Sequence, residues 1–268
     1  MEDEPMNKTP ESLKLLFVGN SFAVDTMEHT ANIALSLGIK SIKFGTLYVG
    51  GCSIDMHHNH AYNDMPVYKY YVNTGDGWSS TPEYKRSDAI KSDDWDWIAI
   101  QHGTKNGSRY TSPECYEKLD SLIDYIKELA PEAKIAFNMT WLGEPTKDHH
   151  EIISYGGDMA RMREELCKVK REVILTNPRI DKFIPTGTAI ENARTSRLGI
   201  LTRDGYHLSY DKGRFIAGLA LISTIADLDV TGISWAPEGV DEYARLVAIE
   251  SAKNAMKFPL EITQSKLI

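Results

Sequence analysis

A short apolar run near the start of the chain, at residues 13–18, ends abruptly at Gly19-Asn20-Ser21. Its length, its composition and the turn residues after it are typical of a strand buried inside a parallel sheet. Gly19 and Asn20 allow the backbone to turn sharply, because both tolerate conformations that other residues avoid. Ligands bind at the carboxyl ends of strands in open α/β sheets, so Ser21 is predicted to stand at a functional edge. The structural alternative is a serine that only caps the next helix.

Strand-like and helix-like segments alternate along the rest of the chain. We predict further strands at 41–49, 96–100, 134–139 and 182–185, and helices at 25–37, 113–129, 158–175, 212–226 and 240–256. Strands that alternate with helices form a parallel sheet with helices on both faces. The pattern therefore predicts an α/β fold, a three-layer α/β/α sandwich around a central parallel sheet of about five strands.

Residues 52–92 differ in character from the segments around them. They contain several histidines and many aromatic residues but few aliphatic ones, and Gly75-Asp76-Gly77 could form a hairpin turn. Because this segment has too little aliphatic content for a core of its own, we interpret it as an excursion from the sheet within a single domain of residues 1–268. Its aromatic side chains either line a binding cleft or pack against the main body.

The composition is that of an ordinary globular protein, with 268 residues of which 42% are hydrophobic and 25% charged. A net charge of -8 argues against nucleic acid or an anionic membrane as a partner. The three cysteines, Cys52, Cys115 and Cys167, lie far apart and form no C-x-x-C pair. This spacing excludes a zinc ribbon and a dithiol redox motif but leaves one disulfide open.

The N-terminus is polar and acidic, and we expect residues 1–10 to be flexible. It lacks the basic and then apolar layout of a signal peptide, and no apolar run in the chain is long enough to span a bilayer. The sequence therefore predicts a soluble protein whose compartment stays open. It is cytoplasmic as written, or secreted or periplasmic if a leader has been removed.

Several common catalytic motifs are absent from the sequence. It contains no G-x-S-x-G elbow, no phosphate-binding P-loop, no dinucleotide-binding G-x-G-x-x-G and no H-E-x-x-H. What remains is Ser21 at the end of the first strand and an Asp-x-x-His pair, Asp204 and His207, just before a predicted helix.

These residues suit nucleophilic catalysis, because a hydroxyl nucleophile needs a base within hydrogen-bond reach and that base needs a third group to fix its tautomer. A single turn containing Gly205 can aim Asp204 and His207 at one place. Histidine ordinarily titrates near pH ~6.5, which suits it to accept a serine proton near neutral pH. Asp204 would orient the imidazole and stabilise its protonated form. The structural alternatives are an Asp that caps the helix or organises a turn and a partly buried His with its hydrogen bonds satisfied.

The order and spacing of four short motifs resemble the SGNH, or GDSL-like, hydrolase family. The motifs are Gly19-Asn20-Ser21, Gly50-Gly51, Gln101-His102-Gly103 and Asp204-Gly205-Tyr206-His207, and the resemblance spans residues 13–226. It implies a flavodoxin-like three-layer fold and a serine hydrolase with a catalytic triad of Ser21, His207 and Asp204. It also implies an oxyanion hole formed by the backbone N–H groups of Ser21 and Gly51 together with one side-chain amide.

The third motif departs from the family pattern. The family usually shows G-x-N-D with the Asn side chain as a donor, whereas Gly103-Thr104-Lys105-Asn106 has a lysine in the asparagine's place. Gln101 resembles the glutamine used by acetylesterase-like relatives, and Asn106 is the alternative donor. We predict Gln101, because a residue at a strand end is held more rigidly than one farther along a loop.

Three residues near these motifs are expected to contact the substrate: Asn20, His57 and His102. His57, His58 and His60 could also form a metal site, but adjacent histidines on a loop are a poor fit for three convergent ligands. We therefore expect neither a metal nor another cofactor.

The sequence as a whole favours a serine esterase that removes a small acyl group, such as acetyl, from a carbohydrate-like or other polar acceptor. The polar, aromatic segment 52–92 favours a sugar-like acceptor over a lipid, because sugars stack on aromatic faces. Two alternatives stay open: a lipase or thioesterase for an apolar acyl chain, and a non-catalytic glycan-binding protein on the same fold. The expected partner is a small-molecule or glycan ester, with no nucleic acid and no membrane, and the oligomeric state is left open.

Overall fold

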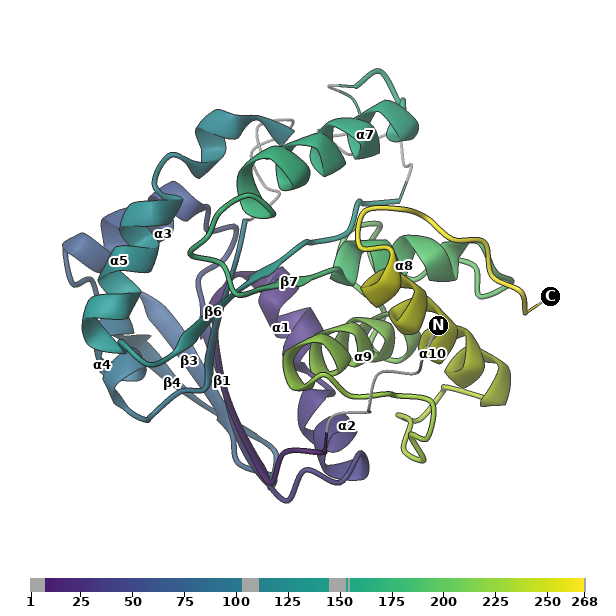
Figure 1. The fold of residues 1–268 in the computed structure, drawn as a ribbon, viewed down its shortest axis with the longest axis horizontal. Helices are drawn as coiled ribbons and strands as arrows, with labels where there is room; N and C mark the ends of the chain where they lie inside the picture. The colour runs from purple at the N-terminus through teal and green to yellow at the C-terminus, as the bar shows by residue number, and fades with distance from the viewer. Residues whose placement is uncertain (1–7, 103–110, 145–152, 154, 268) are drawn as a thin grey trace.

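A seven-stranded sheet runs through the middle of the computed structural model, which describes residues 8–102, 111–144, 153 and 155–267 (Figure 1). The order of the strands in the sheet is β4-β3-β2-β1-β5-β6-β7. The strands are β1 (Ser12–Gly19), β2 (Ser41–Tyr48), β3 (Tyr68–Asn73), β4 (Trp78–Tyr84), β5 (Trp97–Gln101), β6 (Lys134–Asn138) and β7 (Lys182–Ile184).

The strands β2, β1, β5, β6 and β7 pair in parallel, which confirms the predicted parallel sheet of a three-layer α/β/α sandwich. β1 lies at the centre, between β2 and β5. Its side chains at 15–18 are completely buried, because helices cover both faces of the sheet there. An uninterrupted apolar run is therefore what this position requires.

The segment 52–92, expected to be an excursion, supplies two further strands at one edge of the sheet. β3 and β4 form an antiparallel hairpin on β2. Gly75 and Gly77 of its turn adopt φ angles of +115° and +104°, which glycine reaches without steric cost. Tyr68 and Tyr70 of β3 are buried where aliphatic residues would usually stand. The segment therefore extends the sheet instead of leaving it, and its buried tyrosines pack in the same core cluster as Leu16 and Val18 of β1.

Helices form a separate layer on each face of the sheet (Figure 1). They are α1 (Ser21–Met27), α2 (Thr30–Ser36), α3 (Ile54–Tyr62), α4 (Arg86–Lys91), α5 (Leu119–Leu129), α7 (Met159–Val169), α8 (Thr186–Arg194), α9 (Lys212–Ala226) and α10 (Glu242–Lys257), with a 3-10 turn η2 (Pro113–Tyr116) and a π-helical turn η3 (Lys170–Ile174). One layer contains α1, α2, α8, α9 and α10, and the other contains α3, α4 and α5.

Three of these helices lie where the sequence analysis predicted none: α3, α4 and α8. Each is short and rich in polar or small residues, so no apolar stripe at helical spacing marks it. Close packing holds α8, because a Cβ atom at Gly187 would lie 2.3 Å from the carbonyl oxygen of Thr140. The helix predicted at 25–37 is instead two helices, α1 and α2, and α1 begins earlier, at Ser21.

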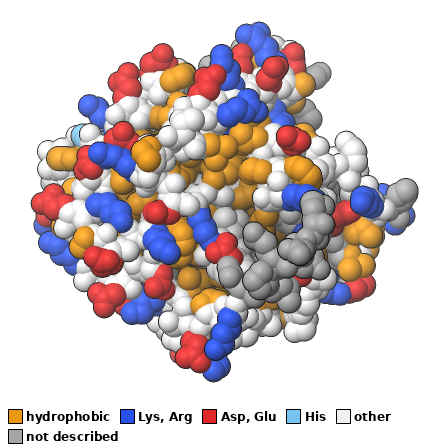
Figure 2. Space-filling view, viewed as in Figure 1, with side chains coloured by type: hydrophobic (Ala, Val, Ile, Leu, Met, Phe, Trp, Pro, Cys, Tyr) orange, Lys and Arg blue, Asp and Glu red, His pale blue; other side chains and the backbone are white. Residues whose placement is uncertain are grey.

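The molecular surface carries charges of both signs. Figure 2 shows acidic and basic side chains interspersed around one face, with hydrophobic side chains gathered toward its middle. Within the described part of the chain, no helix combines the length and the apolar character needed to cross a membrane.

A lysine is buried in the core on the α5 side of the sheet. Lys170, at the start of η3, has its Nζ 4.5 and 5.2 Å from the ring centroids of Tyr116 and Phe137. The same group donates a hydrogen bond to the Tyr116 hydroxyl. Burial disfavours the charged form and lowers the pKa of Lys170 to about 7. Folding therefore takes a proton from this lysine under mildly alkaline conditions.

We predict that Lys170→Met raises thermal stability near pH ~6 and that this gain shrinks toward pH ~9. The unfolded chain keeps the proton up to the ordinary lysine pKa of 10.5, whereas the folded chain releases it at about 7, so wild-type stability rises with pH between these values. The slope for one proton is at most about 1.4 kcal/mol per pH unit. Melting temperatures across this pH range test the prediction. Lys168→Met, at an exposed site near the end of the adjoining helix α7, is the control. A stability difference for Lys170→Met that does not change with pH would contradict the prediction.

Candidate active site

Ser21 begins helix α1 directly after the central strand β1. The Asn20 side chain caps this helix, because its Oδ1 accepts the N–H of Phe22 at 3.0 Å. Gly19 permits the tight passage from strand to helix, since a Cβ atom there would lie 2.6 Å from the Cβ of Ala23. The Gly-Asn-Ser sequence therefore holds the Ser21 hydroxyl at the carboxyl end of β1.

A narrow loop at residues 202–208 carries Asp204 and His207. Thr202 and Leu208 form an antiparallel bridge at its base. Within the loop, Oδ1 of Asp204 accepts two backbone N–H groups, including that of His207 at 2.7 Å. Asp often organises turns in this way, by accepting hydrogen bonds from the backbone that follows it. The spacing of the Asp-x-x-His motif therefore determines the shape of the loop.

The tertiary fold brings this loop against Ser21. Nε2 of His207 lies 2.8 Å from the Oγ of Ser21, and Nδ1 lies 2.7 Å from Oδ2 of Asp204. Both distances are those of hydrogen bonds. The side chains of His207 and Asp204 are 27% and 48% exposed, and Asp211 rather than Asp204 precedes α9. Asp204 is therefore not the cap of α9, although it does organise its own turn, and the partly buried His207 brings all three predicted catalytic residues together.

The carboxyl group of Asp204 favours its ionised form. Partial burial opposes ionisation, but hydrogen bonds from the ring and the backbone N–H of His207 outweigh this effect and lower the pKa of Asp204. A carboxylate in this position favours the histidine tautomer with its proton on Nδ1. Nε2 of His207 is then free to accept the proton of Ser21.

A small cavity opens beside Ser21 and His207, and we call it the Ser21 cavity. It measures 270 Å³, and its described lining consists of Asn20, Ser21, Phe22, Tyr48, Gly50, Gly51, Tyr206 and His207. Gly51 has a φ angle of +63°, so the turn after β2 depends on glycine at this position. The sequence analysis missed three aromatic residues of the wall. Each was signalled by its neighbours, since Phe22 and Tyr206 adjoin predicted catalytic residues and Tyr48 ends β2.

The structure does not place Gln101 on the wall of the Ser21 cavity. Gln101 is completely buried at the end of β5, where its Nε2 donates to Oδ1 of Asn20 at 2.9 Å. Its Oε1 accepts from Asn138 at 3.1 Å, and Asn138 in turn accepts from Thr186 at 2.6 Å. We call these four residues the buried amide chain. The predicted role of Gln101 as a direct oxyanion donor is not supported, because its amide instead orients Asn20.

His57, predicted to contact the substrate, faces the core instead. It lies in α3 on the same face as Ile54 and Ala61, and its side chain is completely buried. Its Nδ1 lies 3.0 Å from a guanidinium nitrogen of the buried Arg86. Burial, reinforced by the positive charge of Arg86, holds the pKa of His57 well below its usual range. A neutral histidine enclosed in the core cannot reach a substrate in the Ser21 cavity.

The other predicted binding residues have different outcomes. Asn20 lines the Ser21 cavity. His102 is buried against Tyr116, with ring centroids 5.3 Å apart, and is not part of the described lining. Asn106, the alternative oxyanion donor, lies outside the described residues. Among the residues that the structure describes, no three His, Cys or carboxylate side chains gather as metal ligands.

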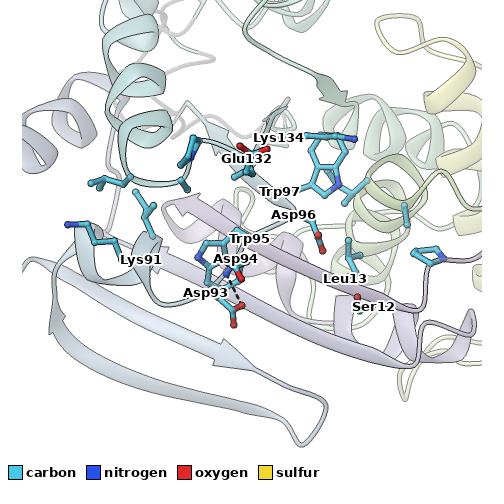
Figure 3. A pocket seen from close by; sticks show the side chains of 18 of the residues that line it. Ser12, Leu13, Lys91, Asp93, Asp94, Trp95, Asp96, Trp97, Glu132 and Lys134 are labelled. Carbon is cyan, nitrogen blue, oxygen red and sulfur yellow. Dashed lines mark hydrogen bonds between the residues drawn. The ribbon is translucent and has the colours of Figure 1, made fainter.

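A larger cavity lies at the opposite ends of the strands from the Ser21 cavity (Figure 3). It measures 840 Å³, lies at the amino ends of β1, β5 and β6, and includes Trp95, Trp97, Asp94 and Lys134 in its lining. None of the predicted catalytic residues lines it. Ligands of open α/β sheets bind at the carboxyl edge, so the smaller Ser21 cavity is the candidate site.

We predict that Gln101→Ala lowers the free energy of unfolding by about 1–3 kcal/mol, because Asn138 loses a buried acceptor and Asn20 loses a buried donor. Chemical denaturation measures this loss, with the exposed Asn63→Ala as the control. A direct oxyanion donor would behave differently. In that case Gln101→Ala would also lose about 100- to 1000-fold in ester turnover, whereas a structural role predicts a smaller loss of turnover.

Comparison with known families and structures places the chain in one family. Residues 14–255 match a family described as a domain of unknown function, DUF4886. A crystal structure of a DUF4886 family protein from Bacteroides uniformis is 30% identical to this chain, with a TM-score of 0.87, and the match covers 94% of this chain and 98% of that one. No curated protein matches the sequence.

Two further solved structures are similar at lower identity. A candidate GDSL-like lipase from Parabacteroides merdae is 14% identical, with a TM-score of 0.50 and coverage of 86% of this chain and 100% of that one. An acetylxylan esterase from Geobacillus stearothermophilus is 15% identical, with a TM-score of 0.48 and coverage of 87% and 100%. The chain therefore belongs to the DUF4886 family and has the α/β fold of GDSL-like, or SGNH, hydrolases.

Proposed function

We propose that this protein is a serine ester hydrolase whose reaction takes place in the Ser21 cavity. The observation that carries the proposal is the hydrogen-bonded row of Ser21, His207 and Asp204 at the cavity wall, with contacts of 2.8 and 2.7 Å. A nucleophile, a base and an orienting carboxylate in contact are what acyl transfer to a hydroxyl requires. The shared fold is consistent with this reading, but the argument rests on the site.

In the proposed reaction, Oγ of Ser21 attacks the ester carbonyl carbon while Nε2 of His207 takes the hydroxyl proton. The tetrahedral intermediate collapses as His207 returns that proton to the leaving alcohol, which leaves an acyl group on Ser21. Water, activated by the same imidazole, then releases the acid and regenerates Ser21. Asp204 holds the ring orientation and stabilises the protonated imidazole throughout.

Two backbone N–H groups are proposed to stabilise the oxyanion. Ser21 is the first residue of α1, so its N–H has no acceptor within the helix. Gly51 belongs to the turn that lines the cavity, and its N–H is the second proposed donor. The amide of Asn20 is committed elsewhere, because its Nδ2 donates to the carbonyl of Cys52 at 3.1 Å. Gln101 contributes through the orientation of Asn20.

The size of the cavity favours a short acyl group. Its 270 Å³ falls just below the range of about 300–1,000 Å³ that is usual for small-molecule sites. Phe22, Tyr48 and Tyr206 supply an aromatic wall rather than a long aliphatic channel. We therefore propose acetyl or a similarly small group as the acyl part of the substrate.

An aromatic surface beside the cavity favours a cyclic, polar alcohol as the other part of the substrate. Tyr48 of the cavity wall meets Tyr71 of β3 edge to face, with ring centroids 6.3 Å apart. Lys69 places its ammonium group 4.8 Å from the centroid of the Tyr71 ring. Aromatic faces next to polar groups suit the alternating apolar and hydroxyl surfaces of a sugar. The proposed substrate is therefore an acylated carbohydrate.

We predict that Ser21→Ala lowers turnover of p-nitrophenyl acetate by several orders of magnitude without loss of the fold, because the members of a triad act as a unit. An organophosphonate should label wild-type protein at Ser21 alone. Kinetics, circular dichroism and peptide mapping measure these outcomes. Substantial activity in Ser21→Ala would show that the proposed mechanism is wrong.

The length of the ester chain separates the proposed function from its alternatives. A preference for acetate over butyrate and octanoate is expected, because the Ser21 cavity is small. The highest rate with octanoate would indicate a lipase or thioesterase. If the wild-type protein shows neither ester turnover nor labelling, the result would favour the non-catalytic glycan-binding alternative.

We predict that Tyr71→Ala weakens the use of acetylated oligosaccharides by about tenfold or more in kcat/KM, because a stacked aromatic contributes about 1–3 kcal/mol on desolvated surfaces. Hydrolysis of p-nitrophenyl acetate should change little, since that ester does not extend onto β3. The control is Tyr62→Ala, an exposed tyrosine on α3. Equal losses on both kinds of ester would refute the sugar-stacking role of Tyr71.

A further inference from the structure

A buried carboxylate connects the helix that carries Ser21 to the loop that carries His207. Asp25 of α1 is completely buried, yet its two oxygens accept hydrogen bonds from three other residues. Oδ1 lies 2.7 Å from Nη2 of Arg214 and 3.0 Å from Nη1 of Arg203. Oδ2 accepts the backbone N–H of Leu208 at 2.9 Å. We call Asp25, Arg203, Arg214 and the Leu208 N–H the Asp25 network.

The position of Asp25 in α1 aligns it with the catalytic contact. Residues four apart in a helix lie on the same face, so Asp25 stands one turn behind Ser21. Leu208 directly follows His207, and so the loop touches α1 at two successive levels. At one level Nε2 of His207 meets Oγ of Ser21 at 2.8 Å, and at the next the Leu208 N–H meets Asp25.

Arg203, on the side of the loop that precedes Asp204, adds further hydrogen bonds to the loop. Its backbone N–H donates to the carbonyl of His207 at 2.8 Å, and its guanidinium donates to both Asp25 and the carbonyl of Leu208. The main chain on either side of the imidazole is therefore tied to α1 through Asp25. Asp204, by contrast, orients the ring itself.

The charges of this network depend on one another. Arg214 of α9 pairs with both Asp25 and Glu28, at 2.7 and 3.1 Å. The ring of Tyr210 covers the two guanidinium groups, with centroid distances of 4.8 Å to Arg203 and 4.6 Å to Arg214. Removing one charged group from a buried ionic network leaves the remaining buried charges without a counter-charge. The network therefore has one favoured geometry.

We propose that Asp25 is a positioning residue that keeps Nε2 of His207 within hydrogen-bond distance of Oγ of Ser21. The inference rests on the proposed esterase function, which it deepens by naming the group that aligns base and nucleophile. Asp25 does not touch the substrate, because the described lining of the Ser21 cavity does not include it. Its effect on the reaction comes from geometry, and misplacement of a reacting group by about 1 Å can cost about 100-fold in rate.

The test is Asp25→Asn, which keeps the shape of the side chain but removes its charge and one acceptor oxygen. For p-nitrophenyl acetate we expect kcat to fall by about 100-fold with KM changed by less than about threefold. The rate of organophosphonate labelling at Ser21 should fall in parallel, because it reports the same Ser21–His207 contact. Assays well below each melting temperature, with circular dichroism as a check, separate this effect from unfolding.

Asp93→Asn is the matched control, because Asp93 also binds two cations, Lys14 and Lys43 at 2.7 Å each, but stands at the opposite edge of the sheet. It should lose stability and keep kcat and labelling within about twofold of wild type. If Asp25→Asn does not fold, Arg203→Gln decides, because its partly exposed side chain leaves Arg214 and the Leu208 N–H on Asp25. It should lower kcat in the same manner, by about tenfold.

The inference is overturned if a folded Asp25→Asn, or Arg203→Gln in its place, retains kcat and labelling within about twofold of wild type. That outcome differs from a failure of the proposed function, which appears in the wild type as an absence of both turnover and labelling at Ser21. In the second case the inference falls with the function on which it rests.

Discussion

The candidate site depends on buried polar side chains that satisfy one another's hydrogen bonds inside an apolar interior. Asn20, Gln101 and Asn138 follow or end the strands β1, β5 and β6, where their amides form a continuous row that Thr186 completes. A buried amide without a partner costs about 1–3 kcal/mol, so each of these side chains has one favoured orientation. In that orientation Asn20 caps α1, and Ser21 is held at the mouth of its cavity.

The Asp25 network likewise consists of buried groups that satisfy one another's hydrogen bonds, but its side chains are charged and it joins residues farther apart in the sequence. The buried amide chain joins neighbouring strands, whereas Asp25 joins α1 to Leu208, which lies 183 positions later. Paired charges in the core are tolerated only with close geometry and full hydrogen bonding. The proposed nucleophile Ser21 therefore follows a residue held by neutral amides from the sheet, and the loop that carries the proposed base His207 is held by an ionic contact with α1.

Much of the fold, and the residues that meet at the candidate site, could be predicted because their signals are local. The apolar run before Ser21, the spacing of Asp204 and His207 and the alternation of strands with helices are each readable over short stretches. The predictions that the structure does not support concern the direction in which a side chain points, or the strand with which a segment pairs. Gln101 ends the expected strand but turns toward Asn20. His57 lies in a polar helix whose inner face nothing in its own sequence marks.

The sequence by itself determined which residues could form buried strands, which turns could follow them and which side chains could act as nucleophile, base and orienting acid. These properties follow from hydrophobicity, backbone freedom and acid–base character, which belong to residues and short motifs. Only the tertiary structure decided that Ser21 meets His207, that the buried Gln101 amide donates to Asn20, and that β3 and β4 join the sheet. The reason is that a polar side chain inside a protein points toward its hydrogen-bond partner, and here those partners come from distant parts of the chain.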